Sequence, residues 1–311
     1  MTAWLNQVFC EDALAGLARI PDESIDLILA DPPYNLGKDY GNDSDKLGTD
    51  AYLRWTEQWL DAALPKLKPN GSLYIFLTWR FSPEIFVMLK QRMTMMNEII
   101  WDRKVPSMGG STRSYSSVHD TIGFFVKRKD YYFDLDAIRV PYDAETKKAR
   151  SRSIFVGSKW LELGYNPKDL WSVSRLHREH PERADHPTQK PLEIVERMVR
   201  ASCPPGGLVL DPFMGSGSTA VAAQRCGRNF VGFELNPVYC EIIASRLAAP
   251  EGQLTVQNNQ PTEPVRAKLS NIAPGNKGRK SIDSPEQCTQ DAEPDPAQPD
   301  LFLEDSIPPC P

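Results

Sequence analysis

The chain has 311 residues, of which 41% are hydrophobic and 25% charged, which fits one large α/β domain or two small ones. Its net charge of −5 does not exclude nucleic-acid binding, because residues 251–311 hold ten acidic and five basic groups and the first 250 residues are neutral. The six cysteines and four histidines show no zinc-type spacing, and no apolar run reaches bilayer length. The first residues, MTAWLNQVFCED, have no basic patch followed by an apolar run, so we expect no signal peptide. These observations predict a cytoplasmic protein without a metal or a membrane partner.

The first 135 residues alternate strand and helix signals. Continuous apolar residues at 25–30 are typical of a strand buried on both faces. The expected elements are a strand over 7–10, a short helix from Asp12, the strand over 25–30, helices over 50–66 and 83–96, and strands over 72–77, 97–101 and 121–127.

Residues 136–183 are polar, basic and aromatic and show no clear period. Order then returns, and we expect a helix over 191–202, a strand over 208–210, a helix over 218–226, a strand over 230–233 and a helix over 237–247 with Asn236 as its N-cap. Buried strands separated by helices predict a doubly wound, mostly parallel α/β sheet with helices on both faces. The stretch 250–311 is rich in Pro, Gln, Asn and acidic residues, which predicts disorder.

The turn Asp31-Pro32-Pro33-Tyr34 follows the apolar strand at 25–30. An exocyclic amino nitrogen of a base is a poor nucleophile because its lone pair is delocalised into the ring. Asp31 and the carbonyl of Pro32 can accept its two N–H bonds and free the lone pair, and the ring of Tyr34 can stack on the base. The tetrapeptide alone also fits a Pro-rich turn with a structural role.

The segment Asp211-Pro212-Phe213-Met214-Gly215-Ser216-Gly217 comes between a predicted strand and a predicted helix. In doubly wound sheets ligands bind at such a point, and glycines let the backbone approach the ligand. Glu234 ends the next predicted strand, where a carboxylate can accept hydrogen bonds from ribose hydroxyls. The pattern favours a nucleotide-cofactor site over glycines that serve only the shape of the turn.

Three motifs in this order resemble the β class of DNA amino-methyltransferases. They are the Asp31–Gly37 segment, then His186-Pro187-Thr188-Gln189-Lys190-Pro191, then Asp211–Gly217. In that permuted class the catalytic tetrapeptide precedes the cofactor turn. The resemblance covers about residues 6–248.

The resemblance implies S-adenosyl-L-methionine as cofactor and double-stranded DNA as substrate. It implies catalysis by Asp31, Pro32, Pro33 and Tyr34. The cofactor-binding residues that it implies are Asp12, Ala13, Asp31, His186, Thr188, Lys190, Pro191, Asp211, Phe213, Gly215, Ser216, Gly217, Ser218, Glu234 and Asn236. For Asp12 and Lys190, capping or salt bridging is the alternative that the residues alone would favour.

The resemblance also implies a division of the chain. We expect a methyltransferase domain over 1–249, with a catalytic half over 1–135, an inserted target-recognition region over 136–185 and a cofactor half over 186–249, before the tail at 250–311. The stretch 103–159 carries twelve basic and six acidic residues. Candidate DNA contacts are Lys38, Arg139, Lys147, Lys148, Arg150, Arg152 and Lys159, each of which also fits a solvated surface.

The target base must leave the duplex to reach such a pocket, and the segment 35–42 is either a loop that closes over it or a fixed surface loop. Asp31 favours adenine-N6 methylation, because cytosine-N4 members of the family usually carry Ser there. Cytosine-C5 chemistry needs a Pro-Cys nucleophile, and the only one is Pro309-Cys310 in the tail. Methylation of RNA or of a protein amide, and DNA binding without catalysis, are less favoured alternatives. A homodimer and a separate restriction endonuclease as partner are both compatible with the resemblance.

Overall fold

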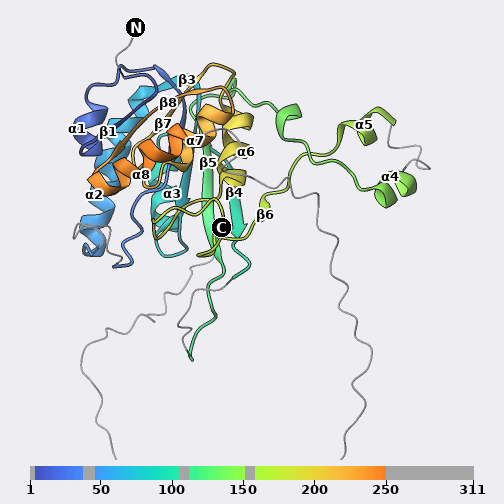
Figure 1. Cartoon of the computed structure of the whole chain (residues 1–311), viewed down its shortest axis with the longest axis horizontal. Helices are drawn as coiled ribbons and strands as arrows, with labels where there is room; N and C mark the ends of the chain where they lie inside the picture. Colours follow the sequence, from blue (N-terminus) through green and yellow to red (C-terminus); the bar gives the residue numbers. More distant parts are fainter. Residues whose placement is uncertain (1–3, 38–45, 106–111, 151–157, 250–311) are drawn as a thin grey trace, which may run out of the picture. The chain divides into compact units, whose positions relative to one another are not determined.

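The computed structural model describes residues 4–37, 46–105, 112–150 and 158–249, without the side chains of 150 and 158–160. Its centre is an eight-stranded sheet with the strand order β1-β8-β7-β2-β3-β5-β4-β6 (Figure 1). The strands are β1 (Gln7–Cys10), β2 (Ile25–Ala30), β3 (Leu67–Leu77), β4 (Thr94–Asp102), β5 (His119–Val126), β6 (Leu170–Ser172), β7 (Leu208–Asp211) and β8 (Asn229–Glu234). The tail 250–311, for which the sequence predicts disorder, lies outside the described residues.

Most neighbouring strands run parallel, as the sequence predicted. β2 pairs in parallel with both β3 and β7, β7 with β8, β8 with β1, and β4 with β6. β5 is the exception and runs antiparallel to β3 and to β4. The α/β fold class with a mostly parallel sheet is therefore confirmed.

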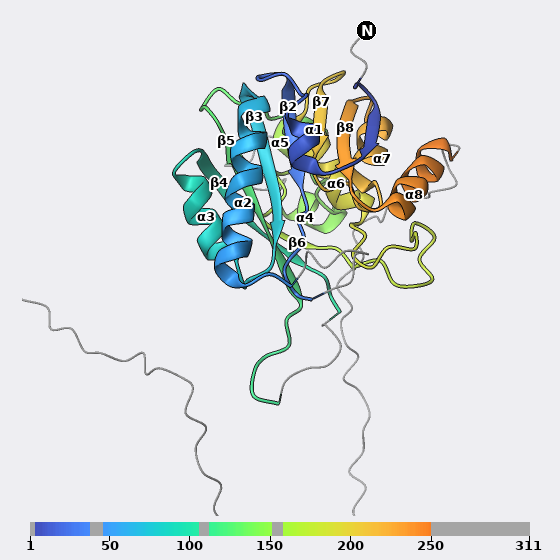
Figure 2. The same ribbon diagram turned by 90° about the vertical axis from the view of Figure 1, so that its left-hand side faces the viewer.

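Helices cover both faces of the sheet (Figure 2). One face packs against α1 (Ala13–Leu17), α2 (Thr49–Ala63) and α3 (Ser82–Lys90), and the other against α6 (Leu192–Ser202), α7 (Ser218–Arg225) and α8 (Pro237–Ala248). Because side chains alternate along a strand, Leu27 and Leu29 join the second layer, while Ile28 and Ala30 join the first. Each helix in the described part of the chain is too short or too polar to cross a bilayer.

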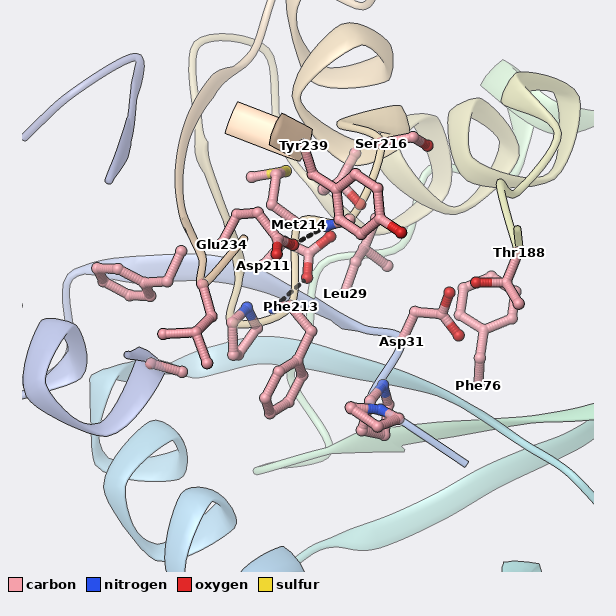
Figure 3. Close-up of a pocket in the computed structure, with 18 of the residues that line it drawn as sticks. Leu29, Asp31, Phe76, Thr188, Asp211, Phe213, Met214, Ser216, Glu234 and Tyr239 are labelled. Carbon is pink, nitrogen blue, oxygen red and sulfur yellow. Dashed lines mark hydrogen bonds between the residues drawn. The ribbon is translucent and has the colours of Figure 1, made fainter. Parts of the chain in front are cut away.

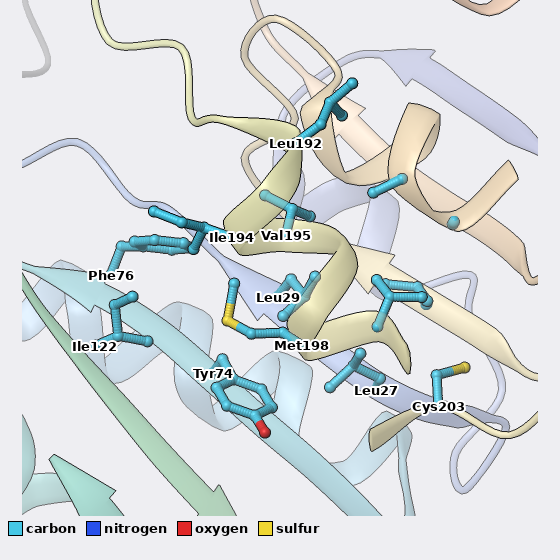
Figure 4. Close-up of a cluster of buried hydrophobic side chains, with 14 of the residues drawn as sticks. Leu27, Leu29, Tyr74, Phe76, Ile122, Leu192, Ile194, Val195, Met198 and Cys203 are labelled. Carbon is cyan, nitrogen blue, oxygen red and sulfur yellow. The ribbon is translucent and has the colours of Figure 1, made fainter. Parts of the chain in front are cut away.

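Helix α6 packs over β2 and β3 in the second layer (Figure 4). Its apolar side chains recur at helical spacing, and Ile194, Val195 and Met198 are buried against the sheet. On the strand side they meet Leu29 of β2 and Phe76 of β3. This packing holds the segment just before α6 over the carboxyl ends of the central strands.

Two predicted segments differ from the structure. The helix predicted over 83–96 ends at Lys90, and β4 begins at Thr94. Residues 94–96 suit a helix by composition, but pairing with β5, a tertiary interaction, makes them a strand.

The irregular stretch 136–183 contains the 3-10 turn Asp136–Ile138, α4 (Ala144–Arg150), α5 (Ser158–Leu163) and β6. β6 belongs to the central sheet through its pairing with β4, so this stretch is not wholly separate from it. Three residues are too few to give a period, which is why the sequence did not predict this strand.

Candidate active site

The tetrapeptide predicted to be catalytic, Asp31-Pro32-Pro33-Tyr34, and the glycine turn lie side by side. β2 and β7 are adjacent and parallel, with Ile28 opposite Leu210 in the register. Asp31 follows the last residue of β2, and Asp211 is the last residue of β7. Since both strands run the same way, both turns lie at the carboxyl edge of the sheet, where the sequence placed them.

The turn after β2 is held by hydrogen bonds from aromatic hydroxyls. Tyr34 donates its hydroxyl to Asp31 Oδ1 at 2.7 Å, and Tyr52 of α2 donates to the carbonyl of Pro33 at 2.8 Å. Both tyrosines are buried. The carboxylate of Asp31 is therefore oriented by its own turn and lies at the side of the pocket next to Thr188 and Phe76 (Figure 3).

Lys190 contacts the carboxylate of Asp31. Its ammonium group forms an ion pair with Asp31 Oδ2 and lies 5.2 Å from the ring centre of Tyr34 and 5.1 Å from that of Phe76. The lysine side chain is buried, so its charge is balanced by Asp31 and by the faces of two rings. This ion pair links the 186–191 segment directly to the turn after β2. Salt bridging, which the sequence offered as the alternative role for Lys190, is therefore observed.

The glycine turn connects β7 to α7 in a backbone conformation that needs glycine. Gly215 and Gly217 have φ of +54° and +82°. A Cβ on Gly217 would lie 2.9 Å from a side-chain carbon of Ile243, and one on Gly215 would lie 3.2 Å from the His186 ring. The turn is tied to β8 because Gly215 donates its N–H to Glu234 Oε2 at 2.7 Å.

The pocket is lined by carboxylates with raised pKa values. Burial raises the pKa of Asp211 to about 7, helped by the negative charges of Asp31 and Glu234 and opposed by bonds from Thr219 and the N–H of Phe213. Burial also raises the pKa of Glu234, although it accepts the N–H of Asn236 and of Gly215. Buried acids at one site favour a ligand that carries positive charge and hydroxyl groups.

A buried arginine supports the glycine turn from behind. Arg246 of α8 donates to the carbonyl of Ser216 at 2.5 Å and is only 7% exposed. Burial lowers its pKa to about 10, and the charge of Glu182 opposes that shift. Ser218 donates its hydroxyl to the carbonyl of Lys190 at 2.8 Å, so the glycine turn and the 186–191 segment are joined.

Most of the predicted site residues line one pocket (Figure 3). The predicted residues that line it are Asp12, Ala13, Asp31, Pro32, Pro33, Tyr34, His186, Thr188, Lys190, Asp211, Phe213, Gly215, Ser216, Ser218 and Glu234. Pro191, Gly217 and Asn236 do not line it and lie at the N-caps of α6, α7 and α8. Asp12 both lines the pocket and caps α1, where its carboxylate accepts the N–H of Leu14 at 2.9 Å.

Several lining residues were not predicted. Trp55 of α2 packs its ring 5.5 Å from that of Phe213, and Tyr239 of α8 packs 4.5 Å from the His186 ring. Phe76 and Leu29 line the pocket from the strands. Trp55 and Tyr239 come from helices whose periodicity indicates only which residues face inward, so no motif in the sequence could single them out.

The predicted DNA contacts that the structure describes, Arg139, Lys147 and Lys148, do not line this pocket. Arg139 forms an ion pair with Asp136 at 2.6 Å, and Lys147 forms one with Glu162 at 2.9 Å. Lys148 lies on α4 with Lys147. Lys38, Arg152 and the side chains of Arg150 and Lys159 are outside the described residues, as is most of the predicted 35–42 loop.

The fold is a mostly parallel α/β sheet, and its pocket brings Asp31 and the glycine turn together at the carboxyl edge, where α/β enzymes bind nucleotide-like ligands. A family model described as DNA methylase, N6/N4 type, matches residues 25–245. A type II methyltransferase of Haemophilus parainfluenzae, M.HpaI, is 38% identical over 78% of this chain and 74% of its own length. The DNA adenine methyltransferase YhdJ of Escherichia coli K12 is 33% identical over 85% of this chain and 92% of its own. The chain belongs to the N6/N4 DNA methylase family.

Solved structures share the fold. The M1.HpyAVI–SAM complex aligns with 78% of this chain and 99% of its own at a TM-score of 0.56 and 24% identity. The cytosine-N4-specific PvuII DNA methyltransferase aligns with 79% of this chain and 87% of its own at a TM-score of 0.59 and 20% identity.

As a member of this family, the protein is an S-adenosylmethionine-dependent DNA amino-methyltransferase. The pocket fits that cofactor in its chemistry. Asp211 and Glu234 suit its positive charges and ribose hydroxyls, and Gly215 leaves the backbone open to close approach.

Proposed function

We propose that the protein methylates the N6 amino group of adenine in double-stranded DNA. The observation that carries this proposal is the carboxylate of Asp31, fixed by Tyr34 at 2.7 Å and lying in the same pocket as the glycine turn. A carboxylate is a strong acceptor for an amino N–H group. The relative named as a DNA adenine methyltransferase, 33% identical over most of both chains, supports the choice of adenine.

In this proposal Asp31 and the carbonyl of Pro32 accept the two N–H bonds of the target amino group. The nitrogen lone pair is then released from conjugation and turned toward the cofactor. Bound S-adenosylmethionine supplies a methyl group on a positively charged sulfur. Asp31 keeps acceptor capacity while bound to Tyr34, because each carboxylate oxygen has two lone pairs. The ammonium of Lys190, now at Oδ2, moves aside or shares that oxygen when the base enters.

The planar faces of Tyr34 and Phe76 bound the space beside Asp31. A flipped base is planar and can lie against such rings in place of the lysine side chain. No cysteine lines the pocket within the described residues, in keeping with direct transfer to an amino nitrogen rather than to a ring carbon.

Cytosine-N4 methylation is the second candidate function. It requires the same two acceptors, and the cytosine-N4-specific PvuII DNA methyltransferase shares the fold. Asp31 favours adenine over cytosine, because cytosine-N4 members of the family that the sequence resembles usually carry Ser at this position.

Mass spectrometry of nucleosides distinguishes the two products. Unmethylated genomic DNA is incubated with the protein and S-adenosylmethionine, then digested. We expect N6-methyladenine, and N4-methylcytosine alone would contradict the proposal. Asp31→Asn should lose more than about 100-fold in rate, a loss typical for an electrostatic group at the reacting atom. It should retain cofactor binding, which calorimetry with S-adenosylmethionine measures.

We also propose that the segment 136–185 carries target recognition within a methyltransferase domain over 1–249. The relatives described as type II methyltransferases support a role in restriction–modification. Sequencing that detects modified bases, applied to DNA from cells expressing the protein, gives the methylated site. Exchanging residues 136–185 with those of a relative should change that site without changing the modified base.

A further inference from the structure

The carboxyl ends of several strands form a continuous edge beside the pocket. Ala30 of β2 lies opposite Ile75 of β3, and Asp102 of β4 lies opposite His119 of β5 and Ser172 of β6. β5 is antiparallel, so it begins where β3 and β4 end. The loops after β4 and β6 project from the same end of the sheet (Figure 2). We call the described loop residues at this edge the carboxyl-edge surface, and they are 78–80, 103–105, 112–118 and 173–185.

The carboxyl-edge surface is basic. It contains seven arginines and lysines and three acidic residues, of which Glu182 is buried. The loop at the opposite edge, 127–136, contains three basic and three acidic residues. Arg80, Lys104 and Arg178 are exposed. Positive charge is therefore concentrated on the side of the sheet where the pocket lies, although the whole chain is acidic.

The same surface exposes aromatic rings. Trp79 is 64% exposed and lies three residues after Phe76, which lines the pocket. A tight turn holds it there, since Phe81 and Ser82 both donate their N–H groups to the carbonyl of Thr78. Tyr115 is fully exposed. Covering an exposed indole with a planar apolar partner is favourable, and the bases of a nucleic acid are such partners.

We propose that the carboxyl-edge surface holds the DNA duplex, with Arg80, Lys104 and Arg178 at phosphates and Trp79 against a base or sugar next to the flipped nucleotide. This rests on the proposed function in that the partner is duplex DNA. From β2 to β6 the edge spans four strand spacings, or about 19 Å, which corresponds to roughly six base pairs. The arrangement places the target base above Asp31 at one end of the contacted segment.

The surface differs from the basic residues predicted from the sequence. Arg139 and Lys147 follow the loop 127–136 at the opposite edge of the sheet. Their charges are paired with those of Asp136 and Glu162. Arg178 is part of the predicted region 136–185, whereas Trp79, Arg80 and Lys104 come from the catalytic half. Sequence reasoning could not collect these residues, because only the register of β3, β4 and β6 brings them to one edge.

Salt dependence of DNA binding tests the proposal. A fluorescent 24-base-pair duplex is titrated with the wild-type protein, the triple variant Arg80→Ala/Lys104→Ala/Arg178→Ala and the control Arg128→Ala/Lys129→Ala, from the opposite edge. Each lost phosphate contact should lower the slope of log affinity against log salt by about 0.9 in magnitude, so the triple variant should lose about 2.7. The control should match the wild type.

Trp79 is tested separately, because stacking releases no counterions. Trp79→Ala should bind the duplex about tenfold more weakly with an unchanged salt slope, and Trp79→Phe should recover part of that loss. An unchanged slope in the triple variant, or an equal decrease in the control, would overturn the proposal. If the wild type binds and methylates DNA while the triple variant binds equally well, only the surface assignment fails. If the wild type gives no methylated base, the proposed function fails instead. Cofactor calorimetry on each variant verifies that the pocket is intact.

Discussion

Asp211 predicts that cofactor binding is coupled to the loss of a proton. It is 3% exposed, and burial together with the charges of Asp31 and Glu234 raises its pKa to about 7. At pH 6 most molecules of the free protein therefore carry a neutral Asp211. S-Adenosylmethionine is cationic at its sulfur and its amino group, so it stabilises the carboxylate and expels the proton.

The size of the coupling follows from the pKa. If binding moves the pKa of Asp211 well below 6, the fraction of free protein with the carboxylate form is about nine-tenths at pH 8 and one-tenth at pH 6. The affinity for S-adenosylmethionine should then fall about tenfold between these two pH values, or about 1.4 kcal/mol.

Calorimetry in buffers with different ionisation enthalpies measures the protons released. We expect release of about 0.8 proton per site at pH 6.5, and a nearly constant affinity between pH 6 and 8 for Asp211→Asn. Glu182→Gln is the matched control, because Glu182 is also a buried acid with a raised pKa but does not line the pocket. If the wild type releases no proton, or if Asp211→Asn keeps the full pH dependence, then the reasoning about burial is refuted.

The remaining predictions concern stability and the support of the site. The unfolded chain ionises Asp211 near pH 4 and the folded chain near 7, so stability should fall as pH rises through this window, by at most about 4 kcal/mol, and Asp211→Asn should raise the melting temperature at pH 8. Gly217→Ala should destabilise the fold by about 1–3 kcal/mol in urea unfolding, given its φ of +82° and the contact with Ile243. Arg246→Met should weaken S-adenosylmethionine binding about tenfold in calorimetry, and Arg246→Lys should weaken it less. Tyr52→Phe, which removes the bond to Pro33, should lower the melting temperature by about 2–4 °C, and an unchanged value would show that the bond adds nothing.

The sequence predicted the sheet and the proximity of the Asp31–Tyr34 turn to the glycine turn, because both predictions depend on local patterns. The apolar run at 25–30 and the strand before Asp211 each predict a parallel strand, and parallel strands end at one edge. Glu234 was predicted at the end of β8, and it is found there bonded to Gly215.

The features that the sequence did not reveal depend on contacts between distant residues. β6 has three residues and exists because β4 pairs with it, with Trp171 opposite Trp101. Lys190 was assigned to the cofactor from a motif, whereas its contact with Asp31 joins residues 159 positions apart. Trp79 gives no signal in a sequence, because exposure is a property of the folded surface.

The strand order has a consequence for how the enzyme is made. β1 pairs with β8 alone, and β2 reaches it only across β7 and β8. The two earliest strands to leave the ribosome are therefore separated by the two latest, which must insert between them before the sheet is continuous. A nascent chain that stops before Leu208 leaves one side of β2 without its neighbour and has no glycine turn. Binding of the cofactor at the glycine turn therefore becomes possible only after β7 and β8 have been synthesised and inserted between β1 and β2.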